Sequence, residues 1–262
     1  MDKEILSIIC TNYNRKDLTK KWLENIEKHW PKIQTELIMV DDCSTDGTKE
    51  FLCEYAEQKK SFYDWQFILK LKETNTGFAD ACAIGQKQAI GKWILITQND
   101  VEFSPESIDA LIDTFKRLEK KITNLGCMGI AGGLVSENEN LRLYDWSNWN
   151  GDGVVGYNQK MKFDYVQVDY LNAFLLLYRG DVAREKGIYF DSRYRFYWED
   201  IDICYQFSRI HGLINLMVSM EANSIPRIHH IRNQTITKLI PEYQQVNDEM
   251  KKVFRKKWYG YL

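Results

Sequence analysis

The chain has 262 residues, 44% of them hydrophobic, which predicts one large globular domain and excludes a disordered or fibrous protein. Its 35 basic and 37 acidic residues leave a formal charge of -2, so nothing marks the whole chain as a nucleic-acid binder. Six scattered cysteines without a C-x-x-C pair are typical of a reducing compartment. Because we find neither a signal-peptide pattern nor the ~20 apolar residues of a membrane helix, we expect a cytoplasmic protein.

Short apolar runs alternate with stretches of helical period over the first hundred residues. We expect strands over 5–10, 37–40, 65–71 and 93–97, and helices over 18–30, 51–56 and 79–90. This alternation predicts an α/β fold with a Rossmann-like, mostly parallel sheet covered by helices on both faces.

The second half of the chain is less regular. We expect strands over 128–135, 174–178 and 213–218, and helices over 200–210 and 246–262. Between them, 144–157 is rich in Gly, Asn, Asp and Trp and predicts a long surface loop. We therefore expect a main domain over 1–240 and a short C-terminal helical extension over 241–262.

Acidic residues follow two of the predicted strands. Asp41 and Asp42 end the second strand, and Asp100 follows the fourth. Ligands of open α/β sheets bind beyond the carboxyl ends of the strands, so we expect these acids to face one crevice. A carboxylate accepts hydrogen bonds from ribose hydroxyls or from a uracil or thymine imide, but it repels phosphate. A ligand with a diphosphate would need a divalent cation here, Mn²⁺ or Mg²⁺.

Several short motifs occur in a recognisable order along the chain. They are LSIICTNYNR at 6–15, VDDCSTDGT at 40–48, NTGF at 75–78, GKWIL at 91–95, QND at 98–100, WEDID at 198–202 and HH at 229–230. Together they resemble the inverting family-2 glycosyltransferases, which have the glycosyltransferase-A fold. The stretch 168–230 looks most like the rhamnosyltransferase-type members.

The resemblance implies a donor site for a UDP- or dTDP-sugar. It assigns the nucleoside to Thr11, Tyr13 and Asp41, with Asp42 nearby. The loop after the third strand would approach the donor, where glycine keeps a side chain out of a tight path. The full set of predicted donor-binding residues is Thr11, Tyr13, Asp41, Asp42, Asn75, Gly77 and Asn99.

The resemblance also implies a divalent metal site. The D-x-D motif of the family reads Gln98-Asn99-Asp100 here, so its first acid is missing. Asp100 is therefore the expected main ligand, with Glu102 as a lesser contributor. The late histidine of the family corresponds to His229 or His230, and in an extended segment only one of the two points inward. The spacing to Thr235 favours His230.

The catalytic prediction concerns the acidic cluster at 199–202. Direct displacement at an anomeric carbon needs a base for the acceptor hydroxyl, and a carboxylate among aromatic residues has its pKa raised toward working pH. The resemblance assigns this base to Asp200, with Glu199 contacting the acceptor or orienting the site. Asp202 is a further candidate. An acidic first turn of a helix would also explain this cluster, and the two interpretations are compatible.

Three other classes of protein are alternatives to a glycosyltransferase. A Rossmann oxidoreductase needs glycines after its first strand, and residues 10–15 contain none. A sugar nucleotidyltransferase would need a glycine-rich phosphate loop near the start, which is also absent. A catalytically inactive nucleotide-sugar or glycan-binding module remains open because Gln98 replaces a metal acid. The expected reaction is metal-dependent single displacement with inversion onto a glycan or other hydroxyl acceptor, in polysaccharide assembly.

Two aromatic segments suggest further contacts. Trp146, Trp149 and Tyr157 could stack on an acceptor sugar. The tail combines basic and aromatic residues, which suits an anionic membrane surface, although a solvated helix explains it as well. The tail residues in question are Lys251, Lys252, Phe254, Arg255, Lys256, Lys257, Trp258, Tyr259 and Tyr261.

Overall fold

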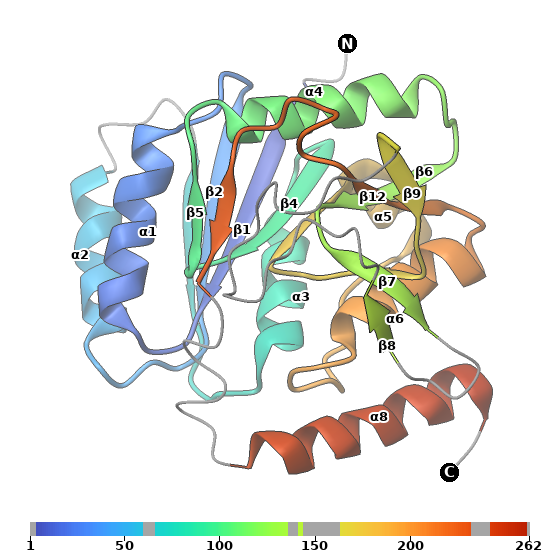
Figure 1. The fold of residues 1–262 in the computed structure, drawn as a ribbon. Coiled ribbons are helices and arrows are strands. Elements are labelled where there is room, and N and C mark those ends of the chain that lie inside the picture. Colours follow the sequence, from blue (N-terminus) through green and yellow to red (C-terminus); the bar gives the residue numbers. More distant parts are fainter. Residues whose placement is uncertain (1–3, 60–65, 136–140, 144–162, 232–241, 261–262) are drawn as a thin grey trace.

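The computed structural model describes residues 4–59, 66–135, 141–143, 163–231 and 242–260. An eight-stranded sheet in the order β3-β2-β1-β4-β11-β6-β12-β9 forms its centre (Figure 1). The first four strands are parallel, whereas β11 runs antiparallel to β4 and β6. The strands are β1 (Leu6–Asn12), β2 (Thr35–Asp41), β3 (Phe67–Leu71), β4 (Trp93–Gln98), β6 (Leu125–Gly129), β9 (Tyr165–Gln167), β11 (Leu175–Arg179) and β12 (Ile214–Val218).

Two small sheets complete the strand arrangement. One has the order β10-β7-β8 and the other pairs β13 with β5 in antiparallel fashion. Their bounds are β5 (Val101–Phe103), β7 (Gly132–Val135), β8 (Leu141–Leu143), β10 (Tyr170–Leu171) and β13 (Ile228–His230). Strand β13 carries His229 and His230, and its pairing with β5 brings them to the end of β4, although β4 is far from them in sequence.

Helices cover the central sheet. In Figure 1, α4 crosses the top of the molecule and α8 crosses the bottom, below α6. The helices are α1 (Lys16–Lys28), α2 (Thr48–Lys59), α3 (Phe78–Gln88), α4 (Ser107–Glu119), α5 (Gly180–Lys186), α6 (Glu199–Tyr205) and α8 (Tyr243–Tyr259). A π-helical turn, Gln206–Ile210, continues α6.

The core lies on both faces of the sheet. Ile8 belongs to an apolar cluster with Trp22 of α1 and Phe115 of α4, whereas the next residue, Ile9, belongs to a second cluster. That second cluster includes Ala81 of α3 and residues of α6 and α8. Successive side chains of a strand point to opposite faces, so a continuous apolar run is needed to fill both clusters.

The predicted α/β fold with a mostly parallel sheet is confirmed, with three local corrections. The stretch 128–135 is two strands, because β6 and β7 belong to different sheets. The expected helix over 200–210 changes to π-helical geometry at Gln206. Helix α4 was not predicted, although its buried residues recur at helical spacing. The predicted loop 144–157 lies outside the described residues, as does Thr235.

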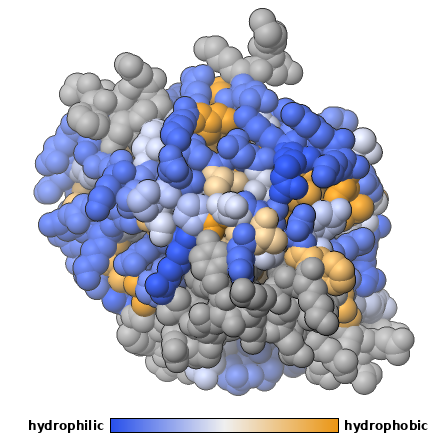
Figure 2. Space-filling model, turned by 45° about the horizontal axis from the view of Figure 1, so that its top comes forward, coloured by the Kyte–Doolittle hydropathy of each residue, from blue (hydrophilic) through white to orange (hydrophobic). Residues whose placement is uncertain are grey.

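The surface of the described part is mainly hydrophilic on the face drawn in Figure 2, where apolar side chains form small separate groups. Exposed large hydrophobic residues include Ile90 and Ile210. Within the described residues, none of the helices is long and apolar enough to cross a membrane.

Candidate active site

The carboxyl ends of β1 and β2 bring Thr11, Tyr13 and Asp41 to one edge of the sheet. The parallel register pairs Asn12 with Asp41, so the loops after the two strands leave the sheet side by side. Thr11 and Asp41 are buried and Tyr13 is half-buried. The predicted nucleoside-binding residues therefore lie together.

The turn that follows β2 orients the carboxylate of Asp41. The backbone N–H of Ser44 donates to Oδ2 over 2.9 Å, and the Ser44 hydroxyl donates to Oδ1 over 2.5 Å. These two hydrogen bonds hold Asp41 at the end of the strand, where its side chain is fully buried.

Asp42 connects β2 to the segment before α3. Its oxygens accept from the backbone N–H groups of Thr76 over 3.1 Å and Gly77 over 2.8 Å, and Lys72 Nζ lies 2.5 Å from Oδ1. The Asn75 amide donates to the Asp42 carbonyl over 3.2 Å. Burial raises the pKa of Asp42, while Lys72 and the two N–H groups oppose this rise. Asp42 thus shapes the loop that we expected to approach the donor.

Lys72 is part of this site, but the sequence did not single it out. Its ammonium contacts Asp80 over 2.8 Å in addition to Asp42, and its side chain is only 8% exposed. In the sequence it is one of many lysines just after an apolar run. Strand β3 pairs with β2 in parallel, and this pairing brings Lys72 to Asp42. The contact could have been predicted from the expected adjacency of these two strands.

Gly77 has a steric reason to be glycine. Its φ is +100°, and a Cβ there would lie 2.0 Å from the Arg195 carbonyl oxygen, which also accepts from Phe78 N–H over 2.8 Å. Arg195 belongs to the loop that leads to Glu199 and Asp200. The tight approach predicted at Gly77 is therefore an approach to the chain's own backbone, which joins the donor loop to the acidic pair.

The end of β4 places Asp100 beside His230. Asp100 Oδ1 lies 3.4 Å from His230 Nε2, and the His230 ring stacks on Phe174 with ring centroids 4.2 Å apart. His229 points the other way, where its Nδ1 lies 3.2 Å from Glu102 Oε2. This alternation follows from the antiparallel pairing of β13 with β5. Asn99 instead donates to Thr19 of α1 over 2.9 Å.

The pair Asp100 and His230 fits part of a divalent metal site. Asp100 is buried, and among the described residues its Oδ1 has no hydrogen-bond partner, which is costly unless a ligand satisfies it. Carboxylate and imidazole are ligands that Mn²⁺ accepts. No group of three or more His, Cys, Asp or Glu side chains that could hold a metal occurs in the described ranges. The remaining ligands would have to come from diphosphate oxygens or water.

Glu199 and Asp200 open α6 and line a pocket of about 330 Å³. The pocket is lined by Tyr170, Asn172, Tyr197, Trp198, Glu199, Asp200, Ile201 and Asn247. Glu199 is buried, whereas Asp200 is half-buried. The structure therefore presents the two predicted acids at a pocket whose walls include the aromatic side chains of Tyr170, Tyr197 and Trp198.

Burial raises the pKa of both acids. It raises the pKa of Asp200 to about 6, against hydrogen bonds from Ile201 N–H and Asn172 that favour the carboxylate. Burial and the neighbouring Asp200 charge hold the pKa of Glu199 well above its usual value. With a pKa of about 6, Asp200 is largely ionised near neutral pH.

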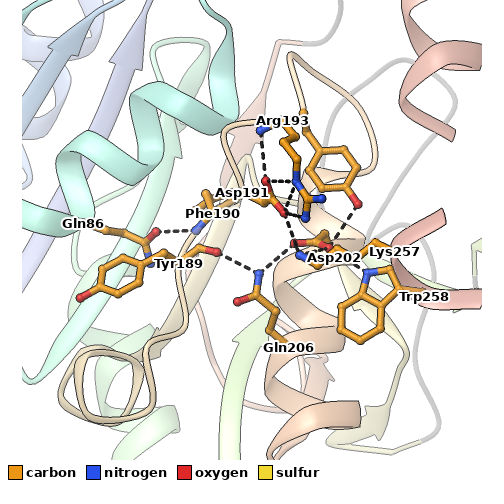
Figure 3. A network of polar contacts seen from close by, with 10 residues as sticks. Gln86, Tyr189, Phe190, Asp191, Arg193, Asp202, Gln206, Lys257 and Trp258 are labelled. Carbon is orange, nitrogen blue, oxygen red and sulfur yellow. Dashed lines mark hydrogen bonds and ion pairs between the residues drawn. The ribbon is translucent and has the colours of Figure 1, made fainter. Parts of the chain in front are cut away.

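Asp202 has a structural role, so its candidacy as a base is wrong. Its carboxylate is fully buried and accepts from Trp258 Nε1 and Gln206 Nε2, each over 2.8 Å, while Lys257 Nζ lies 2.7 Å from Oδ1 (Figure 3). The Tyr194 hydroxyl donates over 3.2 Å. Such a carboxylate is not accessible to an acceptor. We call Asp202, Lys257 and Trp258 the α8 clasp.

The aromatic side chains of the tail face the core. Phe254 is fully buried, and Trp258 and Tyr259 are half-buried against the apolar cluster of α6. Of the two interpretations of the tail, membrane contact is therefore not supported for these aromatic side chains. Tyr261 and the aromatic residues Trp146, Trp149 and Tyr157 lie outside the described residues.

Comparison with known proteins agrees with this arrangement. Over 115 residues the chain is 26% identical to the putative teichuronic acid biosynthesis glycosyltransferase TuaG of Bacillus subtilis, a match that covers 42% of each chain. The chain spans less than half the length of the curated relatives that it matches.

Two solved structures share the fold. The crystal structure of GalNAc-T7 with UDP, GalNAc and Mn²⁺ has a TM-score of 0.62 at 18% identity and covers 97% of this chain and 50% of its own. That of S. aureus TarS 1-349 in complex with UDP-GlcNAc has a TM-score of 0.56 at 16% identity and covers 97% and 73%.

The central sheet and its helices thus have the glycosyltransferase-A fold. Residues 7–175 match the family model Glycosyl transferase family 2, so the chain belongs to that family. The matched range ends before Asp200 and His230, whose roles depend on their geometry.

Proposed function

We propose that the chain transfers a hexose or deoxyhexose from a UDP- or dTDP-sugar to a hydroxyl of a glycan acceptor, with inversion of the anomeric carbon. The observation that carries this proposal is Asp200, whose pKa burial raises to about 6, beside the buried Glu199 in a pocket lined in part by aromatic side chains. The proposal assigns the activity to a catalytic domain over 1–240, with 241–262 as a helical extension. Six free cysteines support a cytoplasmic location.

The reaction would be a single displacement. Asp200 accepts the proton of the acceptor hydroxyl as its oxygen forms a bond to the anomeric carbon, and the bond from that carbon to the donor phosphate oxygen breaks. The nucleoside diphosphate leaves with the electron pair of the broken bond. Thr11, Tyr13 and Asp41 would hold the nucleoside, while the loop around Asn75 and Gly77 forms the neighbouring wall.

Asp100 and His230 would hold a divalent cation, which neutralises charge on the departing diphosphate. The Mn²⁺ in the GalNAc-T7 structure supports this assignment. The missing first acid at Gln98 is compatible with it, because within the described part of the chain Asp100 Oδ1 has no hydrogen-bond partner.

A panel of nucleotide sugars tests the function directly. We expect release of nucleoside diphosphate from a UDP- or dTDP-sugar in Mn²⁺, faster with a sugar acceptor and absent in chelator. Stereochemistry of the product is read by NMR from its anomeric coupling. Binding of the nucleotide sugar without any release would instead indicate an inactive binding module.

Asp100→Ala should remove the metal-dependent part of nucleotide affinity, because it deletes the expected main ligand. Calorimetry with UDP in Mn²⁺ and in chelator measures this part as a difference. Glu102→Ala should have a smaller effect, since Glu102 was expected as a lesser contributor and is exposed in contact with His229. Equal affinity for UDP in Mn²⁺ and in chelator for the unaltered protein would rule out the metal assignment.

A further inference from the structure

Helix α8 supplies one residue of the pocket that holds the acidic pair. Asn247 lines the pocket together with Asp200 and Trp198, although α8 follows them by a long stretch of chain. At about 330 Å³ the pocket is near the lower end of the ~300–1,000 Å³ range of ligand pockets. Its volume and aromatic walls suit one sugar ring.

Several contacts fix α8 relative to the acidic pair. In the α8 clasp, Lys257 and Trp258 of the last turn of α8 bond to Asp202 of α6 (Figure 3). Phe254 packs on Trp198 with ring centroids 5.0 Å apart, and the Arg195 N–H contacts Met250 Sδ over 3.2 Å. These contacts all follow Asn247 along the helix, and they fix the position of the helix that carries it.

The side-chain amide of Asn247 is oriented by its neighbour. Its Oδ1 accepts a hydrogen bond from Trp198 Nε1 over 3.0 Å. An asparagine amide has two N–H donors besides this oxygen, and in the described part of the chain no residue accepts from them. With Oδ1 bound to Trp198, Nδ2 is the polar group that Asn247 can offer to a ligand in the pocket.

We propose that Asn247 is an acceptor-binding residue, whose Nδ2 donates to a hydroxyl oxygen of the acceptor sugar next to the hydroxyl that Asp200 deprotonates. This inference rests on the proposed function. With the Asn247 N–H bound to one hydroxyl and the base Asp200 at the neighbouring one, the attacking oxygen would be aligned. The site would then prefer acceptor sugars that carry both hydroxyls.

Two variants and a set of acceptors test the proposal. Asn247→Asp keeps an oxygen for Trp198 but loses the N–H donors, and Asn247→Ala loses both. Using methyl hexopyranosides as acceptors and the nucleotide sugar selected by the panel, we expect the acceptor KM of Asn247→Asp to rise about 2- to 12-fold, the worth of one net hydrogen bond. The donor KM should stay constant. Asp248→Ala, an exposed neighbour, is the matched control.

Deoxy acceptors make the test specific. For the unaltered protein, removing the contacted hydroxyl from the methyl hexopyranoside should raise the acceptor KM by a similar factor, whereas in Asn247→Ala the same removal should have no effect. An unchanged acceptor KM in both variants, or an equal rise of the donor KM and the acceptor KM, would contradict the role of Asn247. An unaltered protein that releases no nucleoside diphosphate from any donor would instead contradict the proposed function itself.

Discussion

Asp200→Asn should lower kcat for sugar transfer by roughly 10²–10⁴-fold, the usual worth of a positioned general base. Asparagine keeps the size of the side chain and its contacts with Ile201 N–H, but it cannot accept the acceptor proton. Donor affinity should hardly change, because the residues proposed to hold the nucleoside are Thr11, Tyr13 and Asp41. Initial rates of transfer and calorimetric titration with UDP measure the two quantities separately.

The pH profile of transfer should follow the ionisation of Asp200. Only the carboxylate form can act as a base, so kcat should rise with pH through about 6 and level off above it. Glu199→Gln should cost less than Asp200→Asn, because the role proposed for Glu199 is to contact the acceptor or orient the site, not to accept the proton. Loss of transfer in Glu199→Gln with retention in Asp200→Asn would show that the base is the other acid.

Thermal stability provides the control for Asp200→Asn. A carboxyl whose folded-state pKa is raised above its unfolded value destabilises the fold increasingly as pH rises between those two values. Replacing it with a neutral amide should therefore leave the melting temperature unchanged or higher near pH 7. A large fall in transfer without a fall in melting temperature identifies a chemical defect.

Lys257→Met should destabilise the fold by about 3–5 kcal/mol, the usual cost of breaking a buried ion pair from one side. Lys257 Nζ lies 2.7 Å from Asp202, which is fully buried, and 2.9 Å from Asp191. Without the ammonium, the Asp202 carboxylate would remain buried and uncompensated. Urea unfolding followed by circular dichroism measures the change.

The control for Lys257 is its neighbour on the same helix. Lys256→Met should have little effect, because Lys256 is exposed. The double variant Lys257→Met with Asp202→Asn should recover part of the loss, since it also removes the uncompensated charge. Equal destabilisation by the two single lysine variants would mean that the α8 clasp contributes nothing specific.

The ion pair between Lys257 and Asp191 should weaken in acid. Burial alone would raise the pKa of Asp191, but hydrogen bonds from Arg193 and Lys257 outweigh it and hold that pKa well below its usual range. The resulting stabilisation is fully present above the unfolded-state pKa of Asp, about 3.9, and is lost as pH falls toward the folded value. Lys257→Met should therefore show a smaller loss of stability between pH 5 and about 3 than the unaltered protein.

The sequence by itself determined the alternation of strands and helices in the first half of the chain. Apolar runs such as 5–10 fill both faces of the sheet, and this pattern is local in sequence. It also identified the acids that follow β2 and β4, because parallel strands share a carboxyl edge. The choice of His230 over His229 needed only the two-residue period of a strand, and the structure does place His230 beside Asp100.

Only the tertiary structure decided which neighbouring carboxylates differ in role. Glu199, Asp200 and Asp202 lie within one helical turn and look alike in sequence. The arrival of Lys257 and Trp258 from α8 makes Asp202 a structural anchor, whereas the aromatic pocket leaves Asp200 half-buried. The basic and aromatic tail resembled a membrane-binding segment because the sequence alone does not show that its aromatic side chains pack against distant segments. Burial and ion pairing arise between segments far apart in the chain, so a local pattern of residue types cannot specify them.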